Sequence, residues 1–233
     1  MTETWALVPA KAPELAKTRL SAILQPEECA ALSRAMLQDV IHTLENCHSI
    51  DRIAVLTNDT AISTLVNDAG HTAIADVTSK QTSTDALCAG LNAAAEFIAA
   101  QGGTTLIIIP GDLPTLCPAD LDQLLHKHAT SAQPRLSLCP AIRDGGTNAL
   151  VCTPPNALQF KYGADSARVH IETAEQHGLN AQRLPMQAFF RDIDMPEDLF
   201  WLSQQQEESA TATYLRNSGI FARLDPNSLR ASA

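Results

Sequence analysis

The sequence predicts an α/β protein with a mixed, mostly parallel sheet and helices on both of its faces. Short apolar runs alternate with amphipathic helical patterns through the first 130 residues, which is typical of repeated β-α-β units. Residues 106–109 are continuously apolar and rich in isoleucine, as expected for a central strand that is covered on both faces. The chain of 233 residues, 45% of them apolar, is long enough to bury a large core without disulfides or zinc.

Each element in this first part has its own signal. The expected strands are residues 5–9, 52–57, 72–75 and 106–109. The expected helices begin at Pro26, after Asn58-Asp59, at Asp85 and at Pro118. The first helix has a clear apolar stripe, because a large apolar residue recurs at every fourth position from Leu32 to Leu44. Glycines end the second and third of these helices.

The pattern changes after residue 130. Short strands are expected over residues 136–140 and 149–153, followed by a helix over 166–177, a strand end over 189–194 and a last helix from Pro196. One domain therefore spans residues 1–203. Residues 204–233 are polar with few core candidates, so we expect a mobile tail or, alternatively, a segment that packs on the second subunit of a homodimer.

Composition and charge exclude several functions. The net charge of −10 disfavours a nucleic-acid partner, which would require a basic face. No apolar run reaches the length of a membrane span, and residues 1–20 lack the pattern of a signal peptide. The six cysteines form no C-x-x-C pair and no zinc spacing, so we expect reduced thiols and a cytoplasmic location. The histidines are dispersed, and His126 and His128 are expected at the surface.

Two aspartates are candidate ligands for a metal ion. Asp112 follows the apolar run 106–109, and ligands of open α/β sheets bind beyond the carboxyl ends of such strands. Asp192 and Asp194 alternate before Pro196, which would place them on one face of a strand. Magnesium prefers carboxylate oxygens and completes its shell with water and substrate phosphates. The alternatives are a turn aspartate at 112 and helix-start acids after 194.

Basic and glycine-containing segments provide candidate anion sites. Lys11, Lys17 and Arg19 follow the first strand and could bind a triphosphate, or could simply form a solvated loop. Gly163 and Ser166 precede an expected helix whose first amides favour an anion, and Thr147 follows a glycine pair. Taken alone, the segment before residue 166 is better explained as an ordinary helix cap, and the glycine pair before Thr147 is typical of a hairpin turn.

In their order, these pieces resemble the 2-phospho-L-lactate guanylyltransferase family, which includes the phosphoenolpyruvate and 3-phospho-D-glycerate guanylyltransferases of coenzyme F-420 biosynthesis. The matching segments are 5–11, 16–20, 111–114, 144–150, Tyr162-Gly163 with Ser166 and His170, and 192–194. They span residues 5 to 200 and leave the terminal tail outside. The resemblance implies a single-domain, nucleotide-diphospho-sugar transferase-like fold, GTP as the donor and a small phosphorylated acid as the acceptor.

The resemblance also implies roles for individual residues. Asp112 and Asp194 would hold Mg²⁺, with Asp112, Lys17 and Arg19 as the catalytic group. The acid would be bound by Thr147, Gly163 and Ser166. The nucleotide would be bound by Lys11, Lys17, Arg19, Asp85, Gly90 and Asn92. A small residue is expected beside the acid, and Asp165 departs from that expectation. Its carboxylate would repel an anion unless it points away.

Two other functions fit parts of the pattern. A CTP-dependent or molybdopterin-type nucleotidyltransferase would have a glycine-rich loop after the first strand, but residues 5–20 contain no glycine. A non-catalytic nucleotide-binding domain would keep the fold without needing both aspartates. An oxidoreductase on a dinucleotide-binding fold would need G-x-G-x-x-G after the first strand, and this motif is missing.

Overall fold

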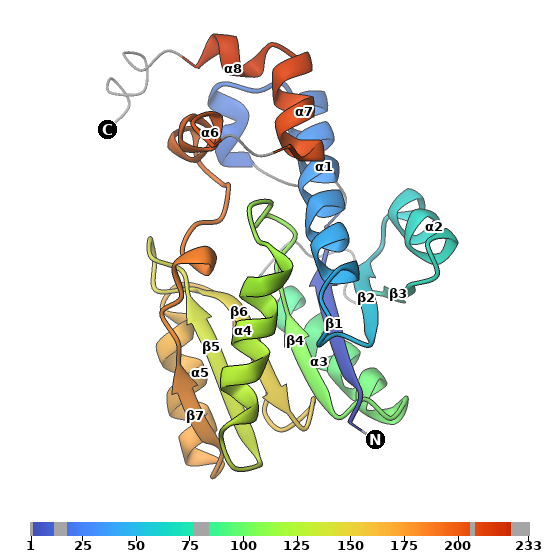
Figure 1. Ribbon diagram of the computed structural model, residues 1–233, viewed down its shortest axis with the longest axis vertical. Coiled ribbons are helices and arrows are strands. Elements are labelled where there is room, and N and C mark those ends of the chain that lie inside the picture. The colour runs from blue at the N-terminus through green and yellow to red at the C-terminus, as the bar shows by residue number, and fades with distance from the viewer. Residues whose placement is uncertain (1, 12–17, 77–83, 206–207, 225–233) are drawn as a thin grey trace.

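The computed structural model describes residues 2–11, 18–76, 84–205 and 208–224. Within these residues one sheet has seven strands in the order β3-β2-β1-β4-β6-β5-β7 (Figure 1). The strands are β1 (Thr4–Pro9), β2 (Arg52–Thr57), β3 (Thr72–Ala75), β4 (Thr105–Ile108), β5 (Arg135–Pro140), β6 (Thr147–Thr153) and β7 (Asn180–Arg183). Strand β6 is antiparallel to β4 and β5, and the other pairs are parallel. The predicted mixed, mostly parallel sheet is confirmed.

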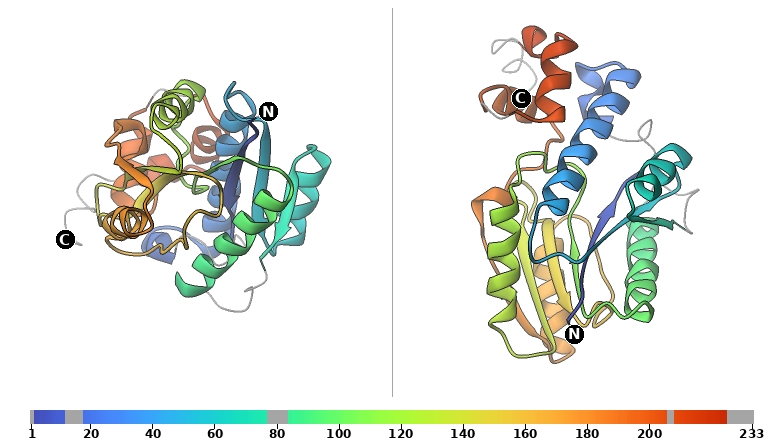
Figure 2. Two further views of the ribbon diagram at one scale, coloured as in Figure 1. Left: turned by 90° about the horizontal axis from the view of Figure 1, so that it is seen from below. Right: turned by 45° about the vertical axis from the view of Figure 1, so that its right-hand side comes forward.

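Helices cover both faces of this sheet. The helices of the described residues are α1 (Pro26–Glu45), α2 (Thr60–Asp68), α3 (Thr84–Ala100), α4 (Pro118–Ala129), α5 (Ser166–Gln176), α6 (Pro196–Ser203), α7 (Ala210–Asn217) and α8 (Ile220–Arg223), with 3₁₀ turns η2 (Thr18–Ala22) and η3 (Gln187–Phe189). Helices α1, α2 and α4 pack on one face, and α3 and α5 pack on the other (Figure 2). Successive strand residues alternate between the two cores, so that Leu7 faces α3 whereas Val8 faces α1.

Three helices begin with the same local device. In α1, α4 and α6 a proline occupies the start, where its missing N–H costs nothing, and an acid two residues later bonds back to the residue before the proline. Glu28 accepts from Gln25 N–H at 2.9 Å, Asp120 from Cys117 N–H at 3.0 Å, and Asp198 from Met195 N–H at 2.8 Å. The sequence therefore fixes these three starts locally, before any packing is considered.

Part of the segment expected to be a polar tail, within residues 208–224, forms helices α7 and α8. Helices α7 and α8 pack beside the first half of α1, with Leu215 and Ile220 buried against Leu32 and Met36 (Figure 1). Asp39 of α1 accepts hydrogen bonds from the first amides of α7 at 2.7 and 2.8 Å. The few apolar residues of this segment are thus enough to cover α1 of the same chain, and a contact with a second subunit stays a prediction.

Residues 189–194 are not the strand end that their composition indicated. The chain makes the turn η3 and then crosses irregularly to α6, and the strand of this region is β7, which ends six residues before Phe189. The apolar residues of the crossing serve two different cores, since Phe189 packs with α1 and α4 while Ile193 packs with α6 and α7. Strand β7 was missed because an edge strand with one neighbour can be polar throughout.

His128 is buried, contrary to the expected surface position. Its ring lies between α4 and the sheet, with Nδ1 at 2.9 Å from Ser137 Oγ of β5 and Nε2 at 2.9 Å from Thr153 Oγ1 of β6. Burial, with a smaller contribution from the charge of Arg135, lowers the pKa of His128 to about 3. The ring is therefore neutral in the folded protein near pH 7 and completes a buried polar cluster between α4 and the sheet.

We expect His128 to make the protein sensitive to acid. The folded pKa lies below the unfolded value of about 6.5, so the unfolded chain binds more protons between these values. Its contribution to stability is complete above pH 6.5 and is lost at up to about 1.4 kcal/mol per pH unit as pH falls toward the folded pKa. Urea unfolding from pH 7 to 4.5 should show this slope. His128→Gln should reduce it, and His126→Gln, at an exposed position on the same helix, should not.

Two findings bear on the compartment and membrane predictions. The six cysteines are all free thiols, four of them buried. In the described part of the chain, no helix combines the length and the apolarity that crossing a bilayer requires.

Candidate active site

The carboxyl ends of the central strands β1 and β4 lie side by side, at the edge of the sheet that these strand ends form. Their register pairs Leu7 with Ile108, so the segments that follow both strands leave the sheet together. Gly111 lies against the end of β1, where a Cβ would be 3.6 Å from Val8 Cγ1 and 3.9 Å from the Pro9 carbonyl oxygen. Asp112 is half-buried beside this contact, and Lys11 is exposed just beyond β1. The structure therefore brings Lys11 and Asp112 to the same edge.

Asp112 and Asp194 lie on two adjoining segments. The backbone N–H of Ile193 donates to the carbonyl oxygen of Asp112 at 3.0 Å, although the two positions are 81 residues apart in the chain. The carboxylate of Asp194 pairs with Arg19 of η2, with Nη1 to Oδ2 at 2.7 Å. Arg19, one of the three predicted cations, and both predicted metal ligands therefore lie on segments that meet at this backbone contact. The expected strand alternation of Asp192 and Asp194 plays no part in this, because the segment is irregular.

Asp198 organises this region, although its position after Pro196 indicates only a helix-start role. Its carboxylate is fully buried and accepts from Arg143 Nη2 at 2.6 and 2.7 Å and from Arg191 Nη1 at 3.1 Å. It also accepts from the backbone N–H groups of Asp194 at 3.1 Å and Met195 at 2.8 Å. Two guanidinium groups therefore share one buried carboxylate next to the segment that contains Asp192 and Asp194.

Arg143 is a cation that sequence reasoning did not assign. The hydrogen bond to Asp198 raises the pKa of Arg143, burial opposes the rise, and the charges of Asp198, Asp192 and Asp194 add to it. Arg143 lies in the loop from β5 to β6, four residues before Thr147. This loop therefore connects the charged cluster to the predicted acid site. The available signal was the pair of arginines, Arg143 in a segment interpreted as a hairpin turn or an anion site and Arg191 in one interpreted as a strand end.

Thr147 and Ser166 form a buried hydroxyl pair. Thr147 begins β6, Ser166 begins α5, and their oxygens are 3.0 Å apart. Thr147 Oγ1 is also 3.1 Å from Nδ1 of His170. Gly163, just before α5, has φ of +128°, and a Cβ there would be 3.3 Å from Thr84 Cγ2 at the start of α3. The three residues expected to bind the acid therefore lie on adjoining segments.

The carboxylate of Asp165 is held by its own helix. It pairs with Arg168 Nε at 2.6 Å, and the residue adopts a left-handed conformation with φ of 57°. The expectation that the first amides of α5 face an anion is wrong, because backbone carbonyls accept from them. Gly163, Gly145 and Asp165 accept from the amides of residues 166, 167 and 168. An anion at this position would have to be bound by side-chain hydroxyls.

The residues predicted for the nucleotide are in different environments. Asp85 is exposed at the first turn of α3, next to the contact between Thr84 and Gly163. Gly90 allows α3 to approach the end of β3, since a Cβ there would be 2.8 Å from Asp76 Oδ1. Asn92 uses its side chain on the backbone of Phe160, accepting from N–H at 2.8 Å and donating to the carbonyl at 3.4 Å. Asn92 therefore holds the loop that contains Gly163.

The donor set fits magnesium bound together with a substrate. Among residues 2–11, 18–76, 84–205 and 208–224, no group of three or more His, Cys, Asp and Glu side chains could hold a metal by itself. Mg²⁺ does not require such a group, because one or two carboxylates suffice when phosphates and water supply the other oxygens. Asp112 and Asp194 satisfy that requirement. Lys17 lies outside the described residues.

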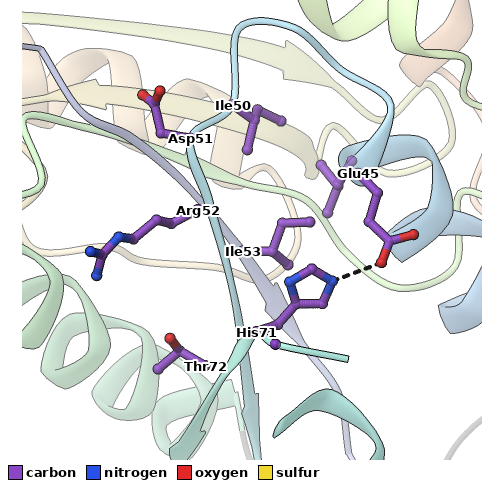
Figure 3. Close-up of a pocket in the computed structure, with 9 residues that line it drawn as sticks. Glu45, Ile50, Asp51, Arg52, Ile53, His71 and Thr72 are labelled. Atoms are coloured by element: carbon purple, nitrogen blue, oxygen red, sulfur yellow. Dashed lines mark hydrogen bonds and ion pairs between the residues drawn. The ribbon is translucent and has the colours of Figure 1, made fainter. Parts of the chain in front are cut away.

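Two hollows elsewhere on the protein are not lined by any predicted site residue. One, of about 480 Å³, lies where β2 and β3 begin, at the opposite edge of the sheet (Figure 3). In it His71 points toward Glu45, with Nε2 to Oε1 at 2.8 Å. The other, of about 1300 Å³, lies along α1 between α2 and α7. The candidate active site is therefore defined by the segments beyond β1 and β4 and before β6, α5 and α6.

The family match and the curated relatives place the chain in the nucleotidyltransferase class of enzymes. The chain belongs to the CofC-like guanylyltransferase family, since the model of the family described as "Guanylyl transferase CofC like" matches residues 4–231. That match extends beyond residue 200 into the segment that forms α7 and α8.

Curated relatives match most of the chain. A phosphoenolpyruvate guanylyltransferase of Conexibacter woesei is 34% identical over 84% of this chain and 85% of its own length. A 3-phospho-D-glycerate guanylyltransferase of Colwellia psychrerythraea is 30% identical, covering 83% and 88%. A 2-phospho-L-lactate guanylyltransferase of Methanothermobacter thermautotrophicus is 30% identical, covering 92% and 90%.

Solved structures show the same fold. A candidate nucleotide-diphospho-sugar transferase of Desulfovibrio desulfuricans superposes with a TM-score of 0.75 at 20% identity, covering 96% of this chain and 98% of its own. A CMP-2-keto-3-deoxy-manno-octonic acid synthetase gives 0.55 at 15% identity, covering 86% and 97%. The predicted nucleotide-diphospho-sugar transferase-like fold is confirmed.

Proposed function

We propose that this chain transfers GMP from GTP to the phosphate of a small phosphorylated carboxylic acid, releasing diphosphate, as a step in coenzyme F-420 biosynthesis. The observation that supports this most is the backbone contact between Asp112 and Ile193, which joins both candidate metal ligands at the sheet edge. Family membership supports guanylyl transfer, and the relatives' names supply the three acids: phosphoenolpyruvate, 3-phospho-D-glycerate and 2-phospho-L-lactate. All three acids present a phosphate and a carboxylate.

The triphosphate of GTP is proposed to lie over the charged half of the site. Lys11 and Arg19 are exposed there, and Lys17 belongs to the segment between them. Arg143 and Arg191 add two further cations, beside the carboxylates of Asp198, Asp192 and Asp194. These cations offset the repulsion of a protein whose net charge is −10, because screening limits distant charges to about 8 Å. Asp85 and Gly90, at the start of α3, are proposed to contact the guanosine.

The acid is proposed to bind at Thr147, Gly163 and Ser166. One hydroxyl of the pair can donate to its oxygens, and Gly163 leaves the approach free of a side chain. Asp165 does not prevent this, since Arg168 pairs with its carboxylate. The shared loop from Arg143 to Thr147 then places acid and nucleotide next to each other.

The reaction requires positioning and charge neutralisation more than acid-base chemistry. An oxygen of the acid's phosphate attacks the α-phosphorus of GTP, the bond to the β-phosphate breaks, and diphosphate leaves. No protein nucleophile is needed, because a phosphate dianion is itself nucleophilic near neutral pH. The proposed roles of this chain are to hold two anions in contact and to stabilise the leaving diphosphate with Arg19 and Lys17. Mg²⁺, held by Asp112 and Asp194, would supply charge neutralisation at the phosphates.

Product analysis tests this function directly. The full chain is incubated with Mg²⁺, each of the four nucleoside triphosphates and each of the three acids, and the products are identified by mass. We expect diphosphate release and a guanylylated acid with GTP only. A product made from CTP would favour the cytidylyl alternative, whereas nucleotide binding without any product would favour a non-catalytic domain.

Ser166→Ala is expected to weaken binding of the acid. The lost hydroxyl can donate to an anionic oxygen, a contact of about 1.5–3 kcal/mol, so the KM for the acid should rise about 10- to 100-fold. The KM for GTP should stay near the wild-type value. Steady-state kinetics with one substrate varied at a time give both constants, and Ser49→Ala, whose hydroxyl bonds Asp122 on α4, is the control. A change confined to GTP would contradict the assignment.

A further inference from the structure

His170 belongs to the hydroxyl pair of the acid site, but no role follows for it from the chemistry of the transfer. It lies in the second turn of α5 and is fully buried. Its ring is fixed edge-on to Tyr162, with centroids 5.1 Å apart, and to Phe160 at 6.4 Å. Both ring nitrogens have partners, which are Thr147 Oγ1 at Nδ1 and the Lys161 backbone N–H at Nε2.

The Lys161 contact determines which nitrogen bears the proton. A backbone N–H can only donate, so Nε2, at 2.9 Å from it, must be the unprotonated acceptor. The proton of the neutral ring is then on Nδ1, which donates to Thr147 Oγ1 at 3.1 Å. Burial lowers the pKa of His170 to about 4, so the ring is neutral near pH 7.

This proton sets the direction of the remaining hydrogen bonds. Thr147 accepts from His170, so its own hydrogen is not needed for the ring. The 3.0 Å contact between Thr147 and Ser166 uses one hydroxyl hydrogen, and the other is left to donate outside the pair. With the opposite tautomer, Thr147 would donate to the ring and Ser166 to Thr147. No hydroxyl hydrogen would then remain, and only lone pairs would face an anion.

The amides of α5 cannot replace that donor. Those of residues 166–168 donate to the carbonyls of Gly163, Gly145 and Asp165. We propose that His170 is a positioning residue for the acceptor acid, which keeps one hydroxyl of the Thr147–Ser166 pair as a donor to an anionic oxygen of that acid. This inference rests on the proposed function, because it assigns the bound anion to the acid at Thr147 and Ser166.

The tautomer is measured first, since it does not depend on activity. Nitrogen-15 NMR of the histidine-labelled full chain should show His170 protonated at Nδ1 and unprotonated at Nε2 at pH 7, with His170→Asn used to assign the signals. A proton on Nε2 would overturn the proposal, whether or not the protein transfers GMP. An enzyme that makes no guanylylated acid with this tautomer intact would instead refute the proposed function, and with it the role in acid binding.

Kinetics then test the role itself. His170→Leu removes the donor, and we expect the KM for the acid to rise at least tenfold with the KM for GTP changed less than twofold. His170→Asn can place an amide N–H near the position of Nδ1 and should restore the KM for the acid to within about threefold of wild type. Equal changes in both KM values, or an unchanged KM for the acid in folded His170→Leu, would overturn the proposal. If His170→Leu does not fold, a tenfold rise in the KM for the acid in His170→Asn would also overturn it.

Discussion

Asp112→Asn should lower kcat about a thousandfold while the fold is kept. The substitution preserves the shape of the side chain and removes the charge that is proposed to bind Mg²⁺. A thousandfold loss corresponds to about 4 kcal/mol of transition-state stabilisation, which is within the range that a metal ion supplies to charged transition states. Diphosphate release with saturating GTP and acid measures the loss, and thermal unfolding measured alongside it shows whether the fold is kept.

Asp122→Asn is the matched control for Asp112→Asn. It makes the same change in net charge on α4, where Asp122 bonds Ser49 and Cys47 and touches no proposed site residue. We expect its kcat to stay within twofold of the wild-type value. Turnover by Asp112→Asn at the rate of this control would remove Asp112 from the mechanism.

Asp198→Asn should both destabilise the protein and reduce its activity. The neutral amide leaves Arg143 and Arg191, both partly exposed, without their counter-charge, and we expect this to cost about 1.5–3 kcal/mol of unfolding free energy. The amides of Asp194 and Met195 also lose part of the group that fixes their segment. A small displacement of Asp194 is enough to lower kcat about a hundredfold. Urea unfolding and initial rates measure the two effects.

Asp39→Asn separates these effects from the general cost of changing a buried carboxylate. Asp39 also accepts from two backbone amides, but these belong to α7 and no arginine is involved. We expect a loss of about 1 kcal/mol in stability with kcat unchanged. If Asp198→Asn were no more harmful than Asp39→Asn, the proposed link between Asp198 and the active site would be wrong.

Local signals were enough to predict most of the fold. Strands β2 and β3 have the bounds that their apolar runs indicated, and α1 begins at Pro26 as expected. These elements depend on periodicity and on capping groups within a few residues. Strand β7 and the helices after residue 204 depend instead on what covers them, because their sequences are mostly polar. Strand β7 and these helices form because other segments of the folded chain pack against them, and the sequence pattern does not show those contacts.

The residues of the candidate site also fall into those that local signals predict and those that depend on contacts in the folded chain. Asp112 was found because a carboxylate after a central strand has a general meaning in α/β sheets. Asp198 looked like a helix-start acid, and it is one, but its second role depends on Arg143 from a loop 55 residues away. His128 was placed at the surface because its partners, Ser137 and Thr153, come from two strands that follow it in the chain. Contacts between distant segments cannot be derived from spacing alone.

Metal binding tests the central claim most directly, which is that Asp112 and Asp194 hold one divalent ion together with GTP. Mn²⁺ can replace Mg²⁺ at oxygen ligands, and its electron paramagnetic resonance signal changes when it binds. The full chain is titrated with Mn²⁺ in the presence of GTP, alongside Asp112→Asn, Asp194→Asn and Asp122→Asn. We predict binding by the wild type and Asp122→Asn that is weakened at least tenfold in both of the other variants. Wild-type Mn²⁺ binding by Asp112→Asn and Asp194→Asn would contradict the account.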